Sequence, residues 1–141
     1  MSYVAPDPDA FMGTKVGNGQ CVAYVKAAAG CPETSKWSEG KKVRGAKIAR
    51  GTAIATFQDG VYHNYTDGRS HAAIYIGQNA TGLIVHDQWT ERPVHERTIS
   101  FRNGGTTPNN DGDAFNVIED IRVLTRITNA KKRSVKNKSI E

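Results

Sequence analysis

The stretch from Gln20 to Ala29, which reads QCVAYVKAAA, is the strongest helix candidate in the chain. Val22, Val25 and Ala29 follow the i, i+3, i+7 spacing of one helical face, and alanine has the highest helix propensity. This places Cys21 in the first turn of the helix. Because the N–H groups and the dipole at a helix start stabilise an anion, the position favours a thiolate and can also stabilise an oxyanion.

Residues on both sides of this stretch delimit the helix. Asn18 or Gly19 is expected to cap its N-terminus, and Gly30 is expected to end it, followed by Pro32, which cannot continue a helix. If the helix were continuous, about 1.5 Å per residue would hold Cys21 and Cys31 roughly 15 Å apart, too far for a disulfide. We therefore expect two free thiols, with Cys31 a small structural residue.

The rest of the chain favours strands. Alternating or apolar runs bounded by turn residues predict strands at Thr52–Phe57, Val61–Tyr65, His71–Ile76, Leu83–Trp89 and near residues 115–127. The segment Gly77–Gly82 is short, polar and bounded by glycine, so it predicts a hairpin. One helix followed by antiparallel strands predicts an α+β fold. Residues 103–113, NGGTTPNNDGD, predict a long loop.

Length and charge limit what else the chain can be. With 141 residues we expect one domain, residues 1–128, and a basic tail, residues 129–141. Residues 1–125 carry equal numbers of basic and acidic groups, so the net charge of +5 comes from residues 126–141. Such a tail is typical of a solvated terminus, and an anchor for an anionic polymer is the alternative.

Targeting features are absent from the sequence. No apolar run approaches the roughly 20 residues of a transmembrane helix, so we expect no transmembrane segment. The first ten residues, MSYVAPDPDA, lack the basic and apolar regions of a signal peptide. We therefore expect synthesis in the cytoplasm and, for work outside it, secretion by another route.

A nucleophilic cysteine needs a base, and the chain offers His63, His71, His86 and His95. His71 is the best candidate because it opens an apolar strand, where a polar side chain suggests a cleft. If the hairpin loop is centred near residues 79–80, position 71 lies opposite residues 87–88. This register favours Asp87, or else Gln88, as the group that orients the imidazole.

These residues resemble the motifs of the CHAP and NlpC-type cysteine amidases, which are papain-like peptidoglycan hydrolases. The segment 19–25, GQCVAYV, resembles their nucleophile helix; segment 70–77, SHAAIYIG, their histidine strand; and segment 85–89, VHDQW, the strand that orients the histidine. The match covers roughly residues 13–90 in the order Cys, His, acid. Two features depart from the family: the strand before His71 lacks the usual Gly-Asp, and Val61–Arg69 is a longer insertion.

The resemblance implies a papain-like fold, with the nucleophile helix packed on an antiparallel sheet. Small members of this superfamily include amidase effectors delivered by type VI secretion into the periplasm of rival bacteria. The chain is similar to them in length, which implies an antibacterial toxin, a peptidoglycan stem peptide as substrate, and an immunity protein as partner. No cofactor and no metal are implied.

The roles implied for the site start with Cys21 as nucleophile, His71 as general base and then acid, and Asp87 as the orienting group. The backbone N–H of Cys21 is expected to hold the oxyanion. Candidates for further oxyanion or substrate contacts are Gln20, Gln88 and Trp89. Gln20 could equally be a helix-start residue without a catalytic part, and Trp89 a buried core residue. Groove-lining aromatic candidates besides Trp89 are Trp37, Tyr62 and Tyr65.

Three other readings stay open. A metal site could combine Cys21, His71 and either His86 or His95, although no metal-binding spacing supports it. A binding module without catalysis could use the basic tail on nucleic acid, but only with salt-sensitive, unspecific affinity, so we expect no specific nucleic-acid partner. The same Cys–His–Asp site could also carry out transpeptidation or act on an amide outside the cell wall.

Overall fold

The structure is a computed structural model of the chain, and it describes residues 1–120. The predicted basic tail, residues 129–141, and the end of the predicted domain lie outside the described residues. The described elements are α1 (Cys21–Ala29), η1 (Thr34–Lys36), β1 (Trp37–Lys42), β2 (Ala53–Thr56), β3 (Ala72–Gln78), β4 (Gly82–Trp89), β5 (Arg92–Ser100), η2 (Pro108–Asn110), η3 (Gly112–Ala114) and β6 (Phe115–Asp120).

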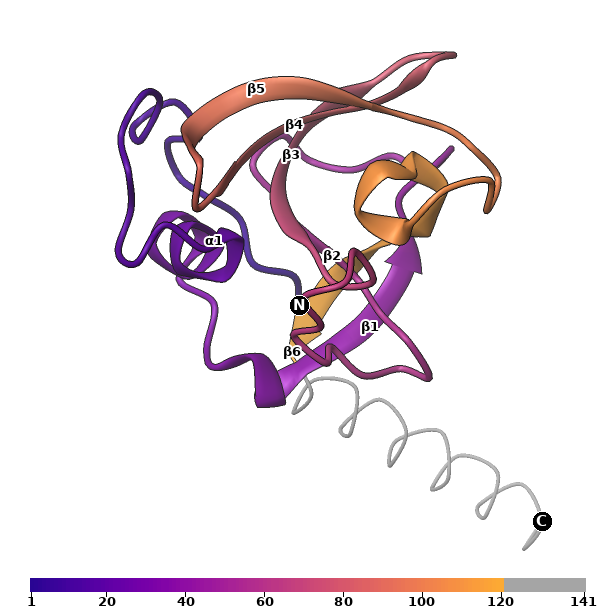
Figure 1. Cartoon of the computed structure of the whole chain (residues 1–141), viewed down its shortest axis with the longest axis horizontal. Helices are drawn as coiled ribbons and strands as arrows, with labels where there is room; N and C mark the ends of the chain where they lie inside the picture. The colour runs from indigo at the N-terminus through magenta and orange to yellow at the C-terminus, as the bar shows by residue number, and fades with distance from the viewer. Residues whose placement is uncertain (121–141) are drawn as a thin grey trace, which may run out of the picture.

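The strands form one antiparallel sheet in the order β1-β6-β2-β3-β4-β5. Helix α1 packs against β3 and β4 (Figure 1). The core has two parts because neighbouring residues of a strand point to opposite faces. Ala72 and Ile74 of β3 join the cluster that contains the helix residue Tyr24, whereas Ala73 and Tyr75 join the other cluster. The α+β class and the helix-on-sheet arrangement expected from the sequence are therefore confirmed.

Helix α1 begins at Cys21, one residue later than expected, and the predicted N-caps are wrong. Gln20 occupies the N-cap position without a side-chain cap, and the Asn18 side chain accepts a hydrogen bond from its N–H at 3.0 Å. The predicted end is confirmed, because Gly30 has φ 70°, in the left-handed region that glycine adopts without a Cβ penalty. Both cysteines are free, as expected, and Cys31 is buried in the core.

The predicted strands are confirmed in β2, β3 and β4, and in β6 as far as the described residues reach. The strand expected at Val61–Tyr65 is wrong: one isolated bridge joins Gln58 and Val61, and Asn64 turns the chain with φ 57°. Strands β1 and β5 were not expected. Both are edge strands, so few of their side chains are buried and their apolar pattern is weak.

The β3–β4 hairpin has a slightly different register from the expected one. Ile74 lies opposite His86, and an irregularity follows between Tyr75 and Gly77. Continued along the strands, this register places residue 71 opposite residue 89, not 87–88. Asp87 nevertheless shares a face with His71, because residues two apart on a strand point the same way.

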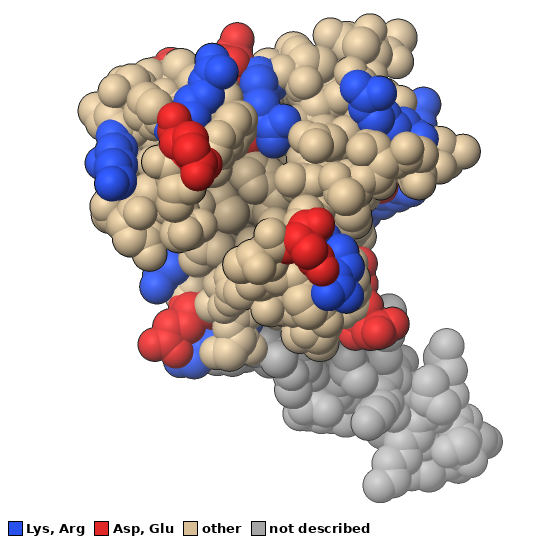
Figure 2. All heavy atoms as spheres, in the orientation of Figure 1, with Lys and Arg blue, Asp and Glu red and all other residues tan. Residues whose placement is uncertain are grey.

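The surface of the described chain mixes both signs of charge. In the view of Figure 2, Lys and Arg side chains are interspersed with Asp and Glu, with uncharged surface between them. Among residues 1–120, no helix is both long enough and apolar enough to cross a membrane.

Candidate active site

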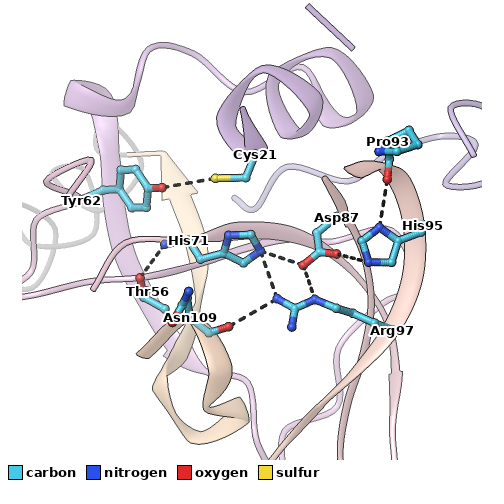
Figure 3. Close-up of polar contacts among 9 residues, drawn as sticks. All are labelled: Cys21, Thr56, Tyr62, His71, Asp87, Pro93, His95, Arg97 and Asn109. Atoms are coloured by element: carbon cyan, nitrogen blue, oxygen red, sulfur yellow. Dashed lines mark hydrogen bonds and ion pairs between the residues drawn. The ribbon is translucent and has the colours of Figure 1, made fainter. Parts of the chain in front are cut away.

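Three segments far apart in sequence bring the predicted nucleophile, base and acid together. Cys21 is the first residue of α1, His71 immediately precedes β3, and Asp87 lies near the end of β4. Figure 3 shows the thiol and the imidazole between the helix and the sheet, with the carboxylate on the far side of the ring. The structure thus groups the three residues that the sequence singles out.

His71 is held firmly at both its backbone and its ring. Its Nε2 lies 2.7 Å from Asp87 Oδ2, and its backbone N–H donates to Thr56 Oγ1 at 3.0 Å. Asp87 is 0% exposed, so this hydrogen bond is shielded from water. Because Nε2 is engaged by the carboxylate, Nδ1 is left for the thiol.

The electrostatics favour a thiolate–imidazolium pair. Burial raises the pKa of the Cys21 thiol, but hydrogen bonding and charge interaction with His71 outweigh it, so the pKa lies below its ordinary value of 9.0. Burial lowers the pKa of His71, but the hydrogen bond to Asp87 and the interaction with Cys21 raise it to about 9. Each partner therefore stabilises the charged form of the other.

Tyr62 reaches the thiol from the insertion that departs from the family pattern. Its hydroxyl lies 3.9 Å from Cys21 Sγ, and its ring packs against the Trp37 ring with centroids 4.8 Å apart. Burial raises the pKa of the Tyr62 phenol and the nearby Cys21 raises it further, so the hydroxyl keeps its proton and can donate. The sequence suggested Tyr62 only as a groove residue.

Strand β5 contributes two residues that sequence analysis missed in this role. Arg97 Nε lies 2.8 Å from Asp87 Oδ2, and His95 Nε2 lies 3.7 Å from Asp87 Oδ1. Burial raises the pKa of Asp87, but hydrogen bonds and charges from His71 and Arg97 outweigh it, so the pKa falls below 3.8. Recognising these residues required the β4–β5 register, in which His95 lies opposite Asp87.

The secondary candidates occupy different positions. Gln20 and Trp89 line the cleft beside Cys21. Gln88 does not: it is 0% exposed, and its side-chain amide donates to the backbone oxygens of Val16 and Gln20, each at 2.8 Å. Its side-chain oxygen accepts from the Val16 N–H at 2.9 Å. Gln88 thus connects the chain before α1 to the sheet.

A cleft of about 650 Å³ opens over the thiol and the imidazole. The described residues that line it include no carboxylate, and Lys26 is the one Lys or Arg among them. Tyr65 lines the cleft as expected, whereas Trp37 is 4% exposed and lies in the core. The expectation of a groove-lining Trp37 is therefore wrong.

His86, one of the possible ligands if the site bound a metal, lies away from the thiol. Its Nδ1 is 3.0 Å from the Pro8 carbonyl oxygen and its Nε2 is 3.1 Å from Glu96 Oε1. Within residues 1–120, no group of three or more His, Cys, Asp or Glu side chains is placed to hold a metal ion.

A helix that starts at a cysteine and packs on an antiparallel sheet, beside an imidazole and a buried carboxylate, defines the class of papain-like amidases. The chain belongs, within that class, to the family described as domesticated amidase effector 2, whose model matches residues 2–118. It is therefore an enzyme, an amidase of the effector type.

Relatives and a solved structure agree with this assignment. A type VI secretion amidase effector 2 protein of Salmonella typhi is 37% identical over 134 residues, covering 84% of this chain and 100% of that protein. A domesticated amidase effector 2 of Ixodes scapularis is 38% identical over 122 residues, covering 80% and 82% of the two chains. The solved structure of type 6 secretion amidase effector 2 (Tae2) has a TM-score of 0.73 and 35% identity, covering 84% of this chain and 94% of that one.

Proposed function

We propose that this chain is a cysteine amidase that hydrolyses amide bonds in the stem peptides of peptidoglycan. In this proposal Cys21 is the nucleophile, His71 the general base and acid, and Asp87 the group that orients His71. One observation carries it: the thiol at the start of α1 and the carboxylate-bound imidazole meet at the floor of an open cleft.

The reaction begins with the thiolate–imidazolium pair. The Cys21 thiolate attacks the amide carbonyl carbon, and the carbonyl oxygen becomes an oxyanion. Collapse of this intermediate breaks the C–N bond as the His71 imidazolium gives its proton to the leaving amine. A water molecule, deprotonated by His71, then attacks the thioester. Collapse of this second intermediate breaks the C–S bond and releases the carboxylic acid product, which leaves the Cys21 thiolate beside a His71 that now carries the proton taken from water.

Several groups are available to hold the oxyanion. The backbone N–H of Cys21 has no acceptor within the helix, because the first N–H groups of an α-helix lack intrahelical partners. The Tyr62 hydroxyl is a second donor beside the sulfur, 3.9 Å away. Gln20 lines the cleft next to Cys21 and is a third candidate. Gln88 is better suited to positioning the chain before α1 than to contacting substrate.

The relatives are named for type VI secretion, which supports a proposal for the setting of the activity. We propose that the chain acts as an antibacterial effector in the periplasm of a target bacterium. A producing cell then needs a cognate immunity protein, and the cleft is the surface that such an inhibitor would cover. Trp89 and Tyr65 would offer ring surfaces to the stem peptide along the cleft.

The test is digestion of purified Gram-negative peptidoglycan, with the muropeptides identified by mass. We expect new stem-peptide fragments from the wild type and none from Cys21→Ala. Cys31→Ala is the matched control, because it removes the other thiol, which is buried in the core, and should digest like the wild type. Intact peptidoglycan with all three proteins folded would contradict the proposal and favour an amide outside the cell wall.

A further inference from the structure

The Asp87 carboxylate is shared between two cationic side chains. Its Oδ2 lies 2.7 Å from His71 Nε2 and 2.8 Å from Arg97 Nε, and the residue is 0% exposed. Arg97 comes from β5, where it pairs with Val85, while His95 pairs with Asp87. The guanidinium therefore reaches the carboxylate diagonally across the β4–β5 pair (Figure 3).

The other end of the guanidinium connects the carboxylate to the wall of the cleft. Arg97 Nη2 lies 3.4 Å from the Asn109 carbonyl oxygen, and the Asn109 N–H donates to the Gly68 carbonyl at 2.9 Å. Asn109 and Gly68 both line the cleft. The Trp89 ring, which also lines the cleft, has its centre 5.2 Å from Arg97 Cζ. One side chain thus touches the orienting acid and two parts of the substrate-binding wall.

Arg97 also lies beside the general base itself. Its Nη2 is 3.4 Å from His71 Nε2. When both ring nitrogens are protonated, the Nε2–H donates to Asp87 Oδ2 and the guanidinium is a like-charged neighbour of the imidazolium. When Nδ1, the nitrogen on the thiol side, gives up its proton, the Nε2–H stays on Asp87 and this like-charge repulsion is relieved. Arg97 therefore favours neutral His71, whereas Asp87 and Cys21 favour charged His71.

We propose that Arg97 is a positioning residue for this site: it fixes the Asp87 carboxylate and makes protonated His71 a readier proton donor to the leaving amine. This inference rests on the proposed roles of Cys21 and His71. A general acid works best when its pKa lies near the working pH, because it is then protonated but still gives up its proton readily. The cation offsets part of the stabilisation that a buried carboxylate and a thiolate give to the imidazolium.

The surroundings of His71 show why Arg97 is the residue to vary. The titratable and charged groups that face it or its direct partners are Cys21 from α1, Asp87 from β4, His95 and Arg97 from β5, and Tyr62 from the loop before β3. Phe115 of β6 contributes only a ring edge, with centroids 6.3 Å apart. Arg97 is the permanent cation in this set.

The first experiment follows the pH dependence of Cys21 alkylation by iodoacetamide, which needs no substrate. Cys31 contributes little, because burial raises the pKa of its thiol to about 12. The rate should rise once as the thiolate–imidazolium pair forms and again as His71 loses its proton. In Arg97→Gln we expect the second step to move up by about one pH unit or more, because a like charge has been removed. Arg92→Gln, the same change at an exposed position of β5, is the matched control and should leave both steps in place.

The second experiment measures the rate of peptidoglycan hydrolysis as a function of pH, including the fall in activity at high pH, which is the basic limb of the profile. Arg97→Gln should lower kcat about tenfold or more and shift the basic limb upward, with thermal unfolding recorded for each variant. Arg97→Lys keeps the charge without the planar fork, so it should keep the limb near its wild-type position while recovering only part of kcat. If Arg97→Gln does not fold, Arg97→Lys carries the test: a second alkylation step more than half a pH unit from the wild-type value would overturn the inference.

Unchanged alkylation steps in folded Arg97→Gln would also overturn it and make Arg97 a structural residue only. The two proposals can fail separately. If the wild type leaves peptidoglycan intact but the alkylation step still moves in Arg97→Gln, then the proposed substrate is wrong and the role of Arg97 stands. If the wild type digests peptidoglycan and the alkylation step does not move in Arg97→Gln, then the proposed function stands and the role of Arg97 is wrong.

Discussion

At the residue scale, the site depends on two groups that hold each other in charged form. Cys21 has a lowered pKa because His71 is next to it, and His71 has a pKa raised to about 9 because Asp87 and Cys21 flank it. In the proposed mechanism, the pair is thus already charged before substrate binds. The remaining question at this scale is what holds the charge that develops during the reaction.

The pH dependence of hydrolysis tests the pair directly. We expect activity to rise through the lowered pKa of Cys21 and to fall as the pH passes about 9, where His71 loses the proton that the leaving amine needs. The measurement is kcat/KM against pH with soluble muropeptides. A basic limb near the ordinary histidine value of 6.5 would contradict the ion pair.

The same shifts affect stability. Because the pKa of His71 is higher in the folded state, its protonation stabilises the fold. This contribution is fully present below pH 6.5, the ordinary pKa of histidine, and is lost as the pH rises toward about 9. The lowered pKa of Asp87 acts in the opposite sense: its contribution is present above 3.8 and is lost as the pH falls below it. Unfolding midpoints in denaturant at several pH values would follow both trends.

Tyr62→Phe tests the second oxyanion donor. The change removes the hydroxyl near Cys21 Sγ and keeps the ring that packs against Trp37, so the fold should be retained. If the hydroxyl donates to the oxyanion, kcat should fall about a hundredfold or more, as for the loss of one oxyanion-hole donor. KM should change little. An unchanged kcat in the folded variant would leave the Cys21 N–H as the main donor.

At the element scale, the position of the nucleophile depends on how α1 is attached to the sheet. The helix start has no side-chain cap, and the hydrogen bonds of buried Gln88 to Val16 and Gln20 take over the positioning. At the other end, Gly30 ends the helix by its left-handed backbone. Strand β4 thus holds both the orienting Asp87 and, one residue later, the support for the helix that carries Cys21.

Gln88→Leu tests this attachment. It should reduce the free energy of unfolding by about 3 kcal/mol, because buried backbone groups lose their partners. Activity should fall as well, since the helix start is no longer fixed. Gln20→Leu is the control for stability: the hydrogen bond from Gln88 goes to the backbone carbonyl of Gln20, so the exposed Gln20 side chain can be replaced at a cost within about 0.5 kcal/mol. Equal unfolding midpoints in denaturant for the two variants would contradict the assigned role.

At the scale of the whole molecule, the candidate site residues lie in the part of the chain that the family model matches. The family model matches residues 2–118, and Cys21, His71, Asp87 and Arg97 all lie within that range. Lys and Arg are interspersed with acids on the face in Figure 2. The excess positive charge resides in residues 126–141, outside the described residues.

Truncation after Thr128 separates an enzyme from a tail-dependent binding module. We expect the truncated chain to give the same muropeptide fragments as the full chain, because no candidate site residue is removed. Any affinity of the full chain for anionic polymers should decline with salt, as charge-driven binding does. Loss of hydrolysis by a truncated chain that still unfolds cooperatively would assign the tail a part in the reaction.

Sequence analysis identified the candidate site residues that belong to a local pattern of the sequence, such as a helix start, a strand or a hairpin. Cys21 follows from a helix start, His71 from the beginning of an apolar strand, and Asp87 from a short hairpin. The expected register was off by one or two residues, yet the acid that contacts His71 is the expected Asp87, because alternate residues of a strand share a face. Residues on weak patterns were misplaced: the Val61–Tyr65 strand is a loop, and Trp37 lies in the core.

The sequence by itself determined the α+β class, the helix that begins at Cys21, and His71 and Asp87 as its candidate partners, because each of these depends on contacts within a few residues or across one hairpin. Only the tertiary structure decided that Arg97 and His95 surround Asp87, that Tyr62 reaches the thiol, and that Gln88 supports the start of α1. These contacts depend on the pairing of an edge strand with β4, on the course of a loop, and on the docking of a helix onto a sheet. No local periodicity encodes them, because the partners are brought together only when the sheet and helix pack.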